Sequence, residues 1–214
     1  HECSSAASDV YKRQVLTGEG DKAFSAGNDL KYSALPADQK VQQPSSGFAG
    51  LTRRFDRTKP IIAAVNGFAM GGGMETALCC DIIIASENAK FALPEVKVGF
   101  FAAAGGVQRL SRQIGKKAAV EIMLTGRNVL AAEALELGII NEVVPHTSLM
   151  EIAMEKAKAI ASNCPSSIRY SMEALNHMDH LENYPDALRK SAELIELLRH
   201  CLLYTSDAAD EHSW

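Results

Sequence analysis

The sequence lacks several features that define common classes of protein. None of its apolar runs approaches the ~18–20 residues that span a bilayer. The N-terminal stretch HECSSAASDVYKRQ has no apolar core of the kind found in a signal peptide. The formal net charge is −4, so no basic surplus favours nucleic acid or an anionic membrane. We therefore expect no nucleic-acid partner and no membrane partner.

Cysteine is scarce, and no C-x-x-C pair occurs. The chain has five cysteines, an odd number: Cys3, Cys79, Cys80, Cys164 and Cys201. The helix-like surroundings of Cys79 and Cys80 favour buried thiols. This pattern predicts a reducing compartment, taken as the cytoplasm, and no disulfide framework.

Several motifs of cofactor and nucleophile chemistry are also missing. The sequence contains no G-x-x-x-x-G-K-[ST], no G-x-G-x-x-G after a strand and no G-x-S-x-G, which argues against a P-loop, a dinucleotide fold and a serine hydrolase. His177 and His180 are three apart on an expected helix but lack a third ligand. We predict no metal and no separate cofactor.

The hydrophobic patterning present predicts a mixed α/β chain. Extended segments are expected at Val15–Thr17, IIAAVN after Pro60, DIIIAS, KFAL and Ile139–Val144. Helices are expected at Phe48–Arg57, from the glycine run to Cys80, at Thr147–Asn163, at Ser166–Met178 and at Pro185–Arg199. Helices dominate from Gly105 onward, and a proline at Pro165 is expected to end the helix before it.

The two ends of the sequence differ from its middle. Their residues are mostly small and polar and show no clear hydrophobic periodicity. Each end abruptly interrupts a segment that does show such a pattern. We expect residues 1–14 and 201–214 to be non-native, residues 15–145 to form a core with the active site, and residues 146–200 to form a C-terminal helical region.

The stretch GFAMGGGMETALCCD, Gly67 to Asp81, places three glycines before a helix. Glycine lets backbone N–H groups approach a ligand closely, and the N–H groups of a first helical turn lack partners within the helix. Glu75 in that turn would repel a phosphate but not a neutral thioester carbonyl, so the pattern favours an oxyanion hole beside an acid–base carboxylate. Taken alone, Glu75 is equally explained as a complement to the helix dipole.

Two further stretches favour the catalytic interpretation. FSAGNDL, Phe24 to Leu30, is a small-residue turn with polar residues, and FALPEVKVGF, Phe91 to Phe100, places Glu95 after a strand-like run. The order of elements allows Glu75 and Glu95 to share one pocket. Two buried carboxylates whose pKa values differ suit proton transfer and water activation.

These segments resemble the crotonase, or enoyl-CoA hydratase/isomerase, superfamily. The similarity is carried by KAFSAGNDL, KPIIAAVNGFAMGGGMETALCCDIIIAS, FALPEVKVG and GGVQRL, and it runs from about Val15 to about Arg199. It implies a spiral of ββα turns, with the first turn missing here, followed by helices that form a homotrimer or a dimer of trimers.

The resemblance also implies roles for particular residues. The oxyanion hole would be the backbone N–H groups of Asn28 and Gly72. Glu75 would act as base on the water, and Glu95 would supply a proton to the substrate. The residues implied to bind the acyl-CoA substrate are Ala26, Gly27, Asp29, Leu30, Gly71, Pro94, Gly99 and Ala103. Coenzyme A would enter only as part of the substrate.

The resemblance leaves several activities open. The leading expectation is hydration of 2-enoyl-CoA thioesters, or the reverse dehydration. FSAGNDLK, GFAGLT and FALPEVKVG resemble the carnitinyl-CoA dehydratase branch, which would use the same two glutamates. An enoyl-CoA isomerase commonly relies on one carboxylate, so an intact pair favours water chemistry. A non-catalytic scaffold of the same fold is the remaining alternative, and it needs neither carboxylate.

Overall fold

The computed structural model describes residues 13–29, 31, 36–39, 44–178 and 184–203. The chain divides into two compact units, which are described separately. The larger unit comprises Gln14–Arg54 and Ile61–Ala157, and the smaller comprises His1–Arg13, Phe55–Pro60 and Lys158–Trp214. Among the described helices, none combines the length and apolar character that crossing a bilayer requires.

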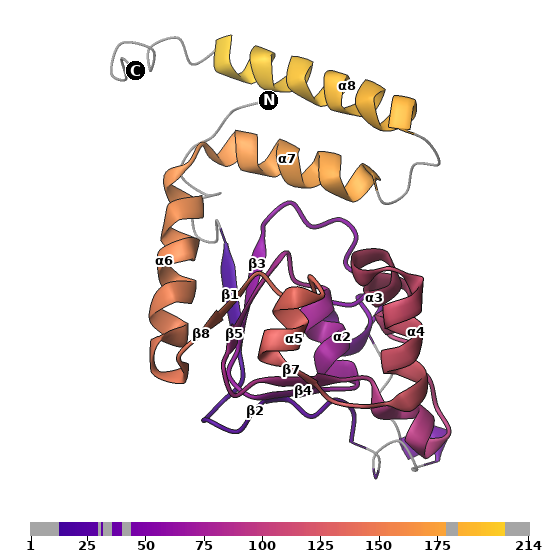
Figure 1. Cartoon of the computed structure of the whole chain (residues 1–214). Coiled ribbons are helices and arrows are strands. Elements are labelled where there is room, and N and C mark those ends of the chain that lie inside the picture. The colour runs from indigo at the N-terminus through magenta and orange to yellow at the C-terminus, as the bar shows by residue number, and fades with distance from the viewer. Residues whose placement is uncertain (1–12, 30, 32–35, 40–43, 179–183, 204–214) are drawn as a thin grey trace. The chain divides into compact units, whose positions relative to one another are not determined.

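Two four-stranded sheets form the frame of the larger unit (Figure 1). The first sheet is entirely parallel and contains, in spatial order, β1 (Gln14–Thr17), β3 (Ile61–Val65), β5 (Ile82–Ser86) and β8 (Glu142–Val144). The second contains β2 (Ala23–Ser25), β4 (Phe68–Met70), β6 (Lys90–Ala92) and β7 (Val129–Leu130), with only the last pair antiparallel.

Strand β3 lies at the centre of the core. All five of its residues are buried, as a parallel strand covered on both faces requires. Its neighbours are in register, with Ile62 opposite Val15 of β1 and opposite Ile82 of β5. The apolar run IIAAV is therefore continuous and does not alternate with polar residues, because neither face of the strand meets water.

The helices of the larger unit fill and cover the space beside the sheets. They are α2 (Gly72–Leu78), α3 (Gly106–Ile114), α4 (Lys116–Thr125), α5 (Ala131–Glu136) and the first part of α6 (Leu149–Ser162). Helix α2 is buried from Gly73 to Leu78 and contacts β2, β4 and α3. In Figure 1, α2 and α5 lie in the angle between the two sheets.

Short 3₁₀ helices complete the connections in the described part of the chain. They are η2 (Ala37–Gln39), η3 (Phe48–Gly50), η4 (Pro94–Val98) and η5 (His146–Ser148). The smaller unit contains α7 (Pro165–Met178) and α8 (Tyr184–Leu203), which pack against each other. Asn176 of α7 donates its side-chain N–H to the carbonyl oxygen of Arg57 at 2.6 Å.

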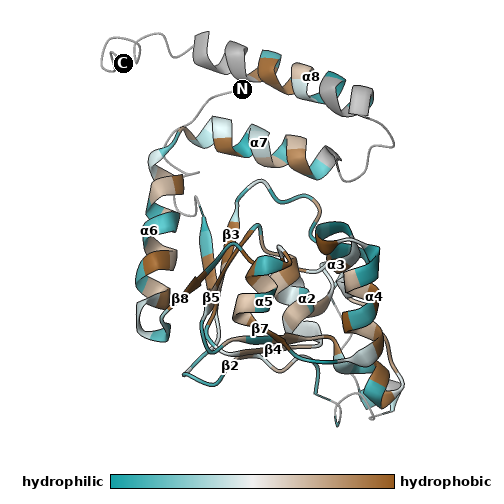
Figure 2. Cartoon of the chain, in the orientation of Figure 1, coloured by the Kyte–Doolittle hydropathy of each residue, from teal (hydrophilic) through white to brown (hydrophobic). Residues whose placement is uncertain are grey.

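The hydropathy of each element fits its place (Figure 2). Strand β5 is almost uniformly hydrophobic, whereas α6 alternates between hydrophobic and hydrophilic residues along its length. On α6 the buried residues are Leu149, Ala153 and Ala157, spaced four apart along the helix. This is the stripe expected of a helix with one face toward the core.

The predicted mixed α/β fold with parallel sheets is confirmed, and most predicted elements are present within a few residues of their expected bounds. The helix predicted over Phe48–Arg57 is wrong. Only one 3₁₀ turn forms there, because Ala49 has φ 53° and Gly50 has φ 66°, which no right-handed helix tolerates. Pro165 does follow the end of α6, but it is also the first residue of α7. The first position of a helix is where proline is best tolerated.

Three strands were not predicted. Strands β2, β4 and β7 have two or three residues each, too few to display a period of two. The expected division into a core, a helical region and non-native ends stays a prediction, as do the missing first turn and the oligomer. Most of the two predicted non-native ends lies outside the described residues.

Candidate active site

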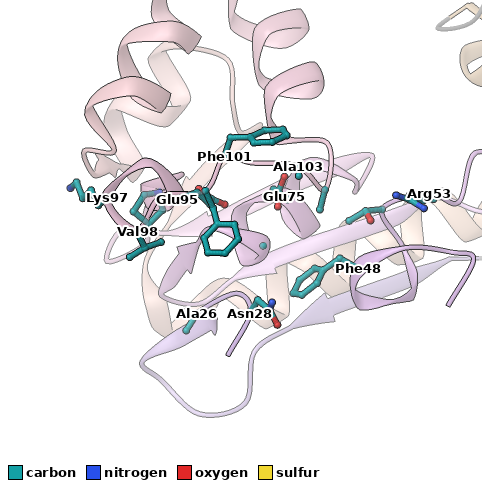
Figure 3. A pocket seen from close by; sticks show the side chains of 16 residues that line it. Ala26, Asn28, Phe48, Arg53, Glu75, Glu95, Lys97, Val98, Phe101 and Ala103 are labelled. Carbon is teal, nitrogen blue, oxygen red and sulfur yellow. The ribbon is translucent and has the colours of Figure 1, made fainter. Parts of the chain in front are cut away.

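A cavity of about 600 Å³ opens in the larger unit (Figure 3). Five segments supply its walls: the loop after β2, the segment around η3, the start of α2, η4 with the residues after it, and the turn before α3. The loop after β2, the η3 segment and the start of α2 lie far apart in the sequence, so the cavity depends on how closely their backbones pack.

Two glycines permit that close packing. Gly71 precedes α2 with φ 53° and ψ −123°, a conformation open only to glycine. Gly27 has φ 86°, and a Cβ there would lie 2.6 Å from the carbonyl oxygen of Met70 and 2.9 Å from the backbone nitrogen of Gly72. Any side chain at position 27 would therefore separate the β2 loop from the first turn of α2. The absence of one lets Asn28 and Gly72 line the same cavity.

Glu75 projects from the first turn of α2 and is only 4% exposed. Its Oε1 accepts a hydrogen bond from the backbone N–H of Gly106 at 2.8 Å. Burial raises the pKa of the Glu75 carboxyl above its ordinary value, and the nearby charge of Glu95 raises it further. The Gly106 N–H and the positive charge of Arg109 oppose that rise because they stabilise the ionised form.

Glu95 lies in the first turn of η4, directly after Pro94. Its Oε2 is buried and has no hydrogen-bond partner among the described residues. Its Oε1 lies close to Gly71, where a Cβ would approach it to 3.2 Å. Burial raises the pKa of the Glu95 carboxyl. A buried carboxyl oxygen without a donor is better matched by the protonated acid, whose O–H can itself donate.

The two carboxylates face the same space. In Figure 3, Glu75 and Glu95 turn toward the cavity, while Asn28 and Phe48 lie on the opposite side of it. Both side chains line this one cavity. The predicted shared pocket is therefore present, although their catalytic roles stay a prediction.

The remaining walls are mostly apolar and aromatic. Phe48, Phe100 and Phe101 line the cavity together with Val98. Phe100 and Phe101 are 63% and 65% exposed, unusual for phenylalanine on a surface unless a ligand covers it. Two exposed cationic residues, Arg53 and Lys97, also line the cavity and stand at opposite ends of it in Figure 3.

The structure brings together eight of the residues that the sequence singles out. Those that line the cavity are Ala26, Asn28, Gly71, Gly72, Glu75, Pro94, Glu95 and Ala103. Gly27 lies immediately behind this lining, against the nitrogen of Gly72. Asp29 and Gly99 are exposed and do not contribute to the lining. Leu30 lies outside the described residues.

Several residues of the site were not predicted. Phe48 was assigned to a helix rather than a pocket wall, and the Gly106 N–H that holds Glu75 was not anticipated. The adjacent phenylalanines at Phe100 and Phe101 gave the one available signal, since an apolar pair in a glycine- and alanine-rich loop has no core to enter. Within the described residues, no group of three or more His, Cys, Asp or Glu is arranged to hold a metal ion.

The site as a whole has the composition of a lyase or isomerase site for an activated carbonyl compound. A buried carboxyl at Glu75 and a half-buried one at Glu95, in different surroundings, can divide the roles of acid and base. The start of α2, whose first backbone N–H groups have no partner within the helix, lines the same cavity. Comparisons with known proteins agree with this class, and residues 5–200 match the enoyl-CoA hydratase/isomerase family. The chain belongs to that family.

Individual relatives make the similarity more specific. A carnitinyl-CoA dehydratase from Salmonella enteritidis PT4 is 47% identical over 154 residues, which cover 72% of this chain and 59% of that protein. The chain therefore spans less than two thirds of the length of the curated relatives it matches.

Solved structures of the family are also similar over most of the chain. An enoyl-CoA hydratase from Bacillus anthracis superposes with a TM-score of 0.81 at 38% identity, covering 88% of this chain and 73% of that one. A carnitinyl-CoA dehydratase from Mycobacterium avium 104 gives a TM-score of 0.70 at 42% identity, covering 86% and 73%.

Proposed function

We propose that this chain hydrates 2-enoyl-CoA thioesters to 3-hydroxyacyl-CoA, or catalyses the reverse dehydration. The observation that carries the proposal is the presence of Glu75 and Glu95 in one cavity with Asn28 and Gly72. An isomerase of this family would need one carboxylate to shuttle a proton, and a scaffold would need none. Family membership and the relatives named hydratase or dehydratase support the same class of reaction.

The thioester carbonyl oxygen binds to the backbone N–H groups of Asn28 and Gly72. As charge develops on that oxygen, both donors stabilise the enolate more than the ground state, which lowers the barrier. Gly72 supplies its N–H from the first turn of α2, where the helix offers it no carbonyl partner.

Glu75 is the base in this proposal. Its ionised form is stabilised by the hydrogen bond from Gly106, so it can accept a proton from water. The water oxygen then forms a bond to Cβ of the enoyl group, and the electron pair of the double bond moves into the thioester to give the enolate.

Glu95 is the acid. Its pKa is raised by burial, and its partnerless Oε2 suits a carboxyl that starts protonated. It delivers its proton to Cα of the enolate, which restores the thioester carbonyl. The net change adds one water across the double bond, and one proton passed between the two carboxyls through solvent restores the starting state.

A second candidate is a dehydratase that acts on an acyl group bearing a trimethylammonium. The phenylalanine rings at Phe48, Phe100 and Phe101 favour it, because aromatic faces attract quaternary ammonium groups. The relatives named carnitinyl-CoA dehydratase support it too. The catalytic steps at Glu75 and Glu95 would be unchanged.

The proposal is tested by mixing the chain with crotonyl-CoA and with crotonobetainyl-CoA and following loss of the conjugated thioester absorbance. Hydration of either substrate supports the proposed reaction, and the ratio of the two kcat/KM values decides between the two candidates. Absence of turnover with both, and with longer enoyl-CoA substrates, would remove the hydratase assignment.

A further inference from the structure

Arg109 of α3 connects two walls of the cavity without lining it. Its guanidinium donates from Nη2 to the carbonyl oxygen of Thr52 at 2.9 Å and from Nη1 to the carbonyl oxygen of Ala104 at 3.3 Å. Thr52 belongs to the segment after η3, and Ala104 belongs to the turn before α3. Both residues line the cavity, so one half-buried side chain fixes the separation of two of its five wall segments.

The surrounding chain leaves room for this guanidinium. Gly105 has φ 109°, and a Cβ at that position would lie 2.0 Å from Nη1 of Arg109. A side chain at residue 105 would therefore displace the guanidinium from the position in which it bonds the turn. This close fit argues that the arginine and the turn form one structural element.

The same turn positions Glu75. Ala104 and Gly106 flank Gly105, and the N–H of Gly106 holds Oε1 of Glu75 at 2.8 Å. If Ala104 moved with the segment that Arg109 anchors, the Gly106 donor would move too. Hydrogen bonding from the backbone of Ala104 also stabilises the ionised Glu75 carboxyl and lowers its pKa, so both backbone donors to Glu75 belong to this turn.

We propose that Arg109 is a positioning residue for Glu75, acting through the turn that it bonds. Arginine suits this task because its planar fork presents separate N–H groups to two carbonyl oxygens, whereas a lysine ammonium is a single point. Thr52 and Ala104 supply one carbonyl each. The two carbonyl oxygens bond to different guanidinium nitrogens, so losing the fork releases the two segments from each other.

A positive charge at this place also acts on Glu75 directly. The charged groups that face or adjoin the cavity are Glu75, Glu95, Arg53, Lys97 and Arg109. Burial and Glu95 raise the pKa of Glu75, while the Gly106 bond and Arg109 lower it. Removing Arg109 therefore moves the pKa of Glu75 upward, and the base becomes protonated over a wider range of acidic pH.

The test compares Arg109→Gln and Arg109→Lys with Arg112→Gln, an exposed arginine of the same helix. Two quantities are measured: the pH profile of kcat/KM for crotonyl-CoA, and the hydrogen-exchange rate of the Gly106 amide. Arg109→Gln should lower kcat by up to about 10²-fold, the scale of a misplaced catalytic group. It should also move the acid limb to higher pH and speed exchange at Gly106.

Arg109→Lys separates charge from geometry. It should leave the acid limb near its wild-type pH, because the charge remains, yet lower kcat and speed Gly106 exchange, because the fork is lost. Arg112→Gln should resemble wild type in every readout. Wild-type kcat, acid limb and Gly106 exchange in Arg109→Gln would overturn the proposal, and so would lost activity with both other readouts unchanged.

The kinetic readouts rest on the proposed hydratase reaction, but amide exchange needs no turnover. A wild-type chain that turns over none of crotonyl-CoA, crotonobetainyl-CoA and longer enoyl-CoA substrates, combined with faster Gly106 exchange in Arg109→Gln, would refute the hydratase assignment and still support positioning by Arg109. An active wild type together with unchanged Gly106 exchange in Arg109→Gln would support the hydratase assignment and refute positioning by Arg109.

Discussion

Glu75 and Glu95 share one cavity but differ in how their carboxyl groups are satisfied. Glu75 accepts the N–H of Gly106 at 2.8 Å, whereas the buried Oε2 of Glu95 has no partner among the described residues. The first arrangement stabilises an ionised carboxylate and the second favours a protonated acid. This difference distinguishes the two glutamates chemically and supports the proposal that Glu75 is the base and Glu95 the acid.

Replacing Glu95 with glutamine should stabilise the fold near neutral pH. The pKa of Glu95 is raised above 4.5 by burial in the folded state, so the folded chain binds that proton more tightly than the unfolded chain does. The stability from this group is full below pH 4.5 and falls as pH rises through the raised pKa. Glu95→Gln removes that loss, which thermal unfolding from pH 4 to pH 8 would detect.

The matched control for this measurement is Glu136→Gln, which removes the same charge from an exposed site on α5. The gain in melting temperature of Glu95→Gln over this control should grow with pH. A constant or shrinking difference would show that the ionised Glu95 carboxylate does not destabilise the folded chain.

The approach of the β2 loop to α2 should tolerate no side chain at Gly27. Gly27→Ala places a Cβ 2.6 Å from the carbonyl oxygen of Met70 and 2.9 Å from the nitrogen of Gly72. The loop must then move away from α2, separating Asn28 from Gly72. We expect lower stability together with lost hydratase activity, measured by chemical denaturation and by crotonyl-CoA turnover.

Gly20→Ala isolates the contribution of backbone strain. Gly20 has φ 74°, close to the 86° of Gly27, yet a Cβ there meets nothing within 4 Å. The strain alone should cost about 1–2 kcal/mol and leave kcat unchanged. Equal effects of the two substitutions on stability and activity would refute the account of close packing at Gly27.

The patterned parts of the chain could be predicted from the sequence because their causes are local. The buried run of β3 and the apolar stripe of α6 each reflect a repeating contact with the core. The segment around Phe48 could not be predicted in this way. Its composition favours a helix, but Ala49 and Gly50 take positive φ values. This backbone conformation brings Phe48 against the start of α2. The contact is with residues distant in sequence, so no local pattern records it.

The phenylalanines of the cavity wall should distinguish the two candidate substrates. Phe101→Leu keeps an apolar side chain but removes the aromatic face. It should lower kcat/KM for crotonobetainyl-CoA by roughly 2- to 30-fold, equivalent to about 0.5–2 kcal/mol of cation–π attraction, with a smaller effect on crotonyl-CoA. The measurement is steady-state kinetics with both substrates.

Phe55→Leu is the control for this substitution, because Phe55 is exposed and lies outside the cavity. An equal loss for both substrates in Phe101→Leu would exclude recognition of a cation by that ring. The simple enoyl-CoA would then be the better-supported substrate.

The site, like the fold, could be predicted from the sequence only where local segments carry a recognisable pattern. Glu75 and Glu95 stand in recognisable segments, so their pairing could be proposed from order and resemblance. Arg109 could not be identified, because its partners are backbone carbonyl oxygens, one of them 57 residues away. Backbone groups are the same in every residue, so the identities of Thr52 and Ala104 carry no trace of that contact.

The central claim is that two glutamates carry the hydration. Its most direct test measures kcat/KM for crotonyl-CoA in Glu75→Gln and Glu95→Gln, with Glu136→Gln as the surface control and thermal unfolding to show that each variant is folded. Each of the two substitutions should lower the rate by about 10²–10⁴-fold, the range for loss of general acid–base catalysis. Folded variants that both hydrate crotonyl-CoA at near wild-type rates would contradict the account.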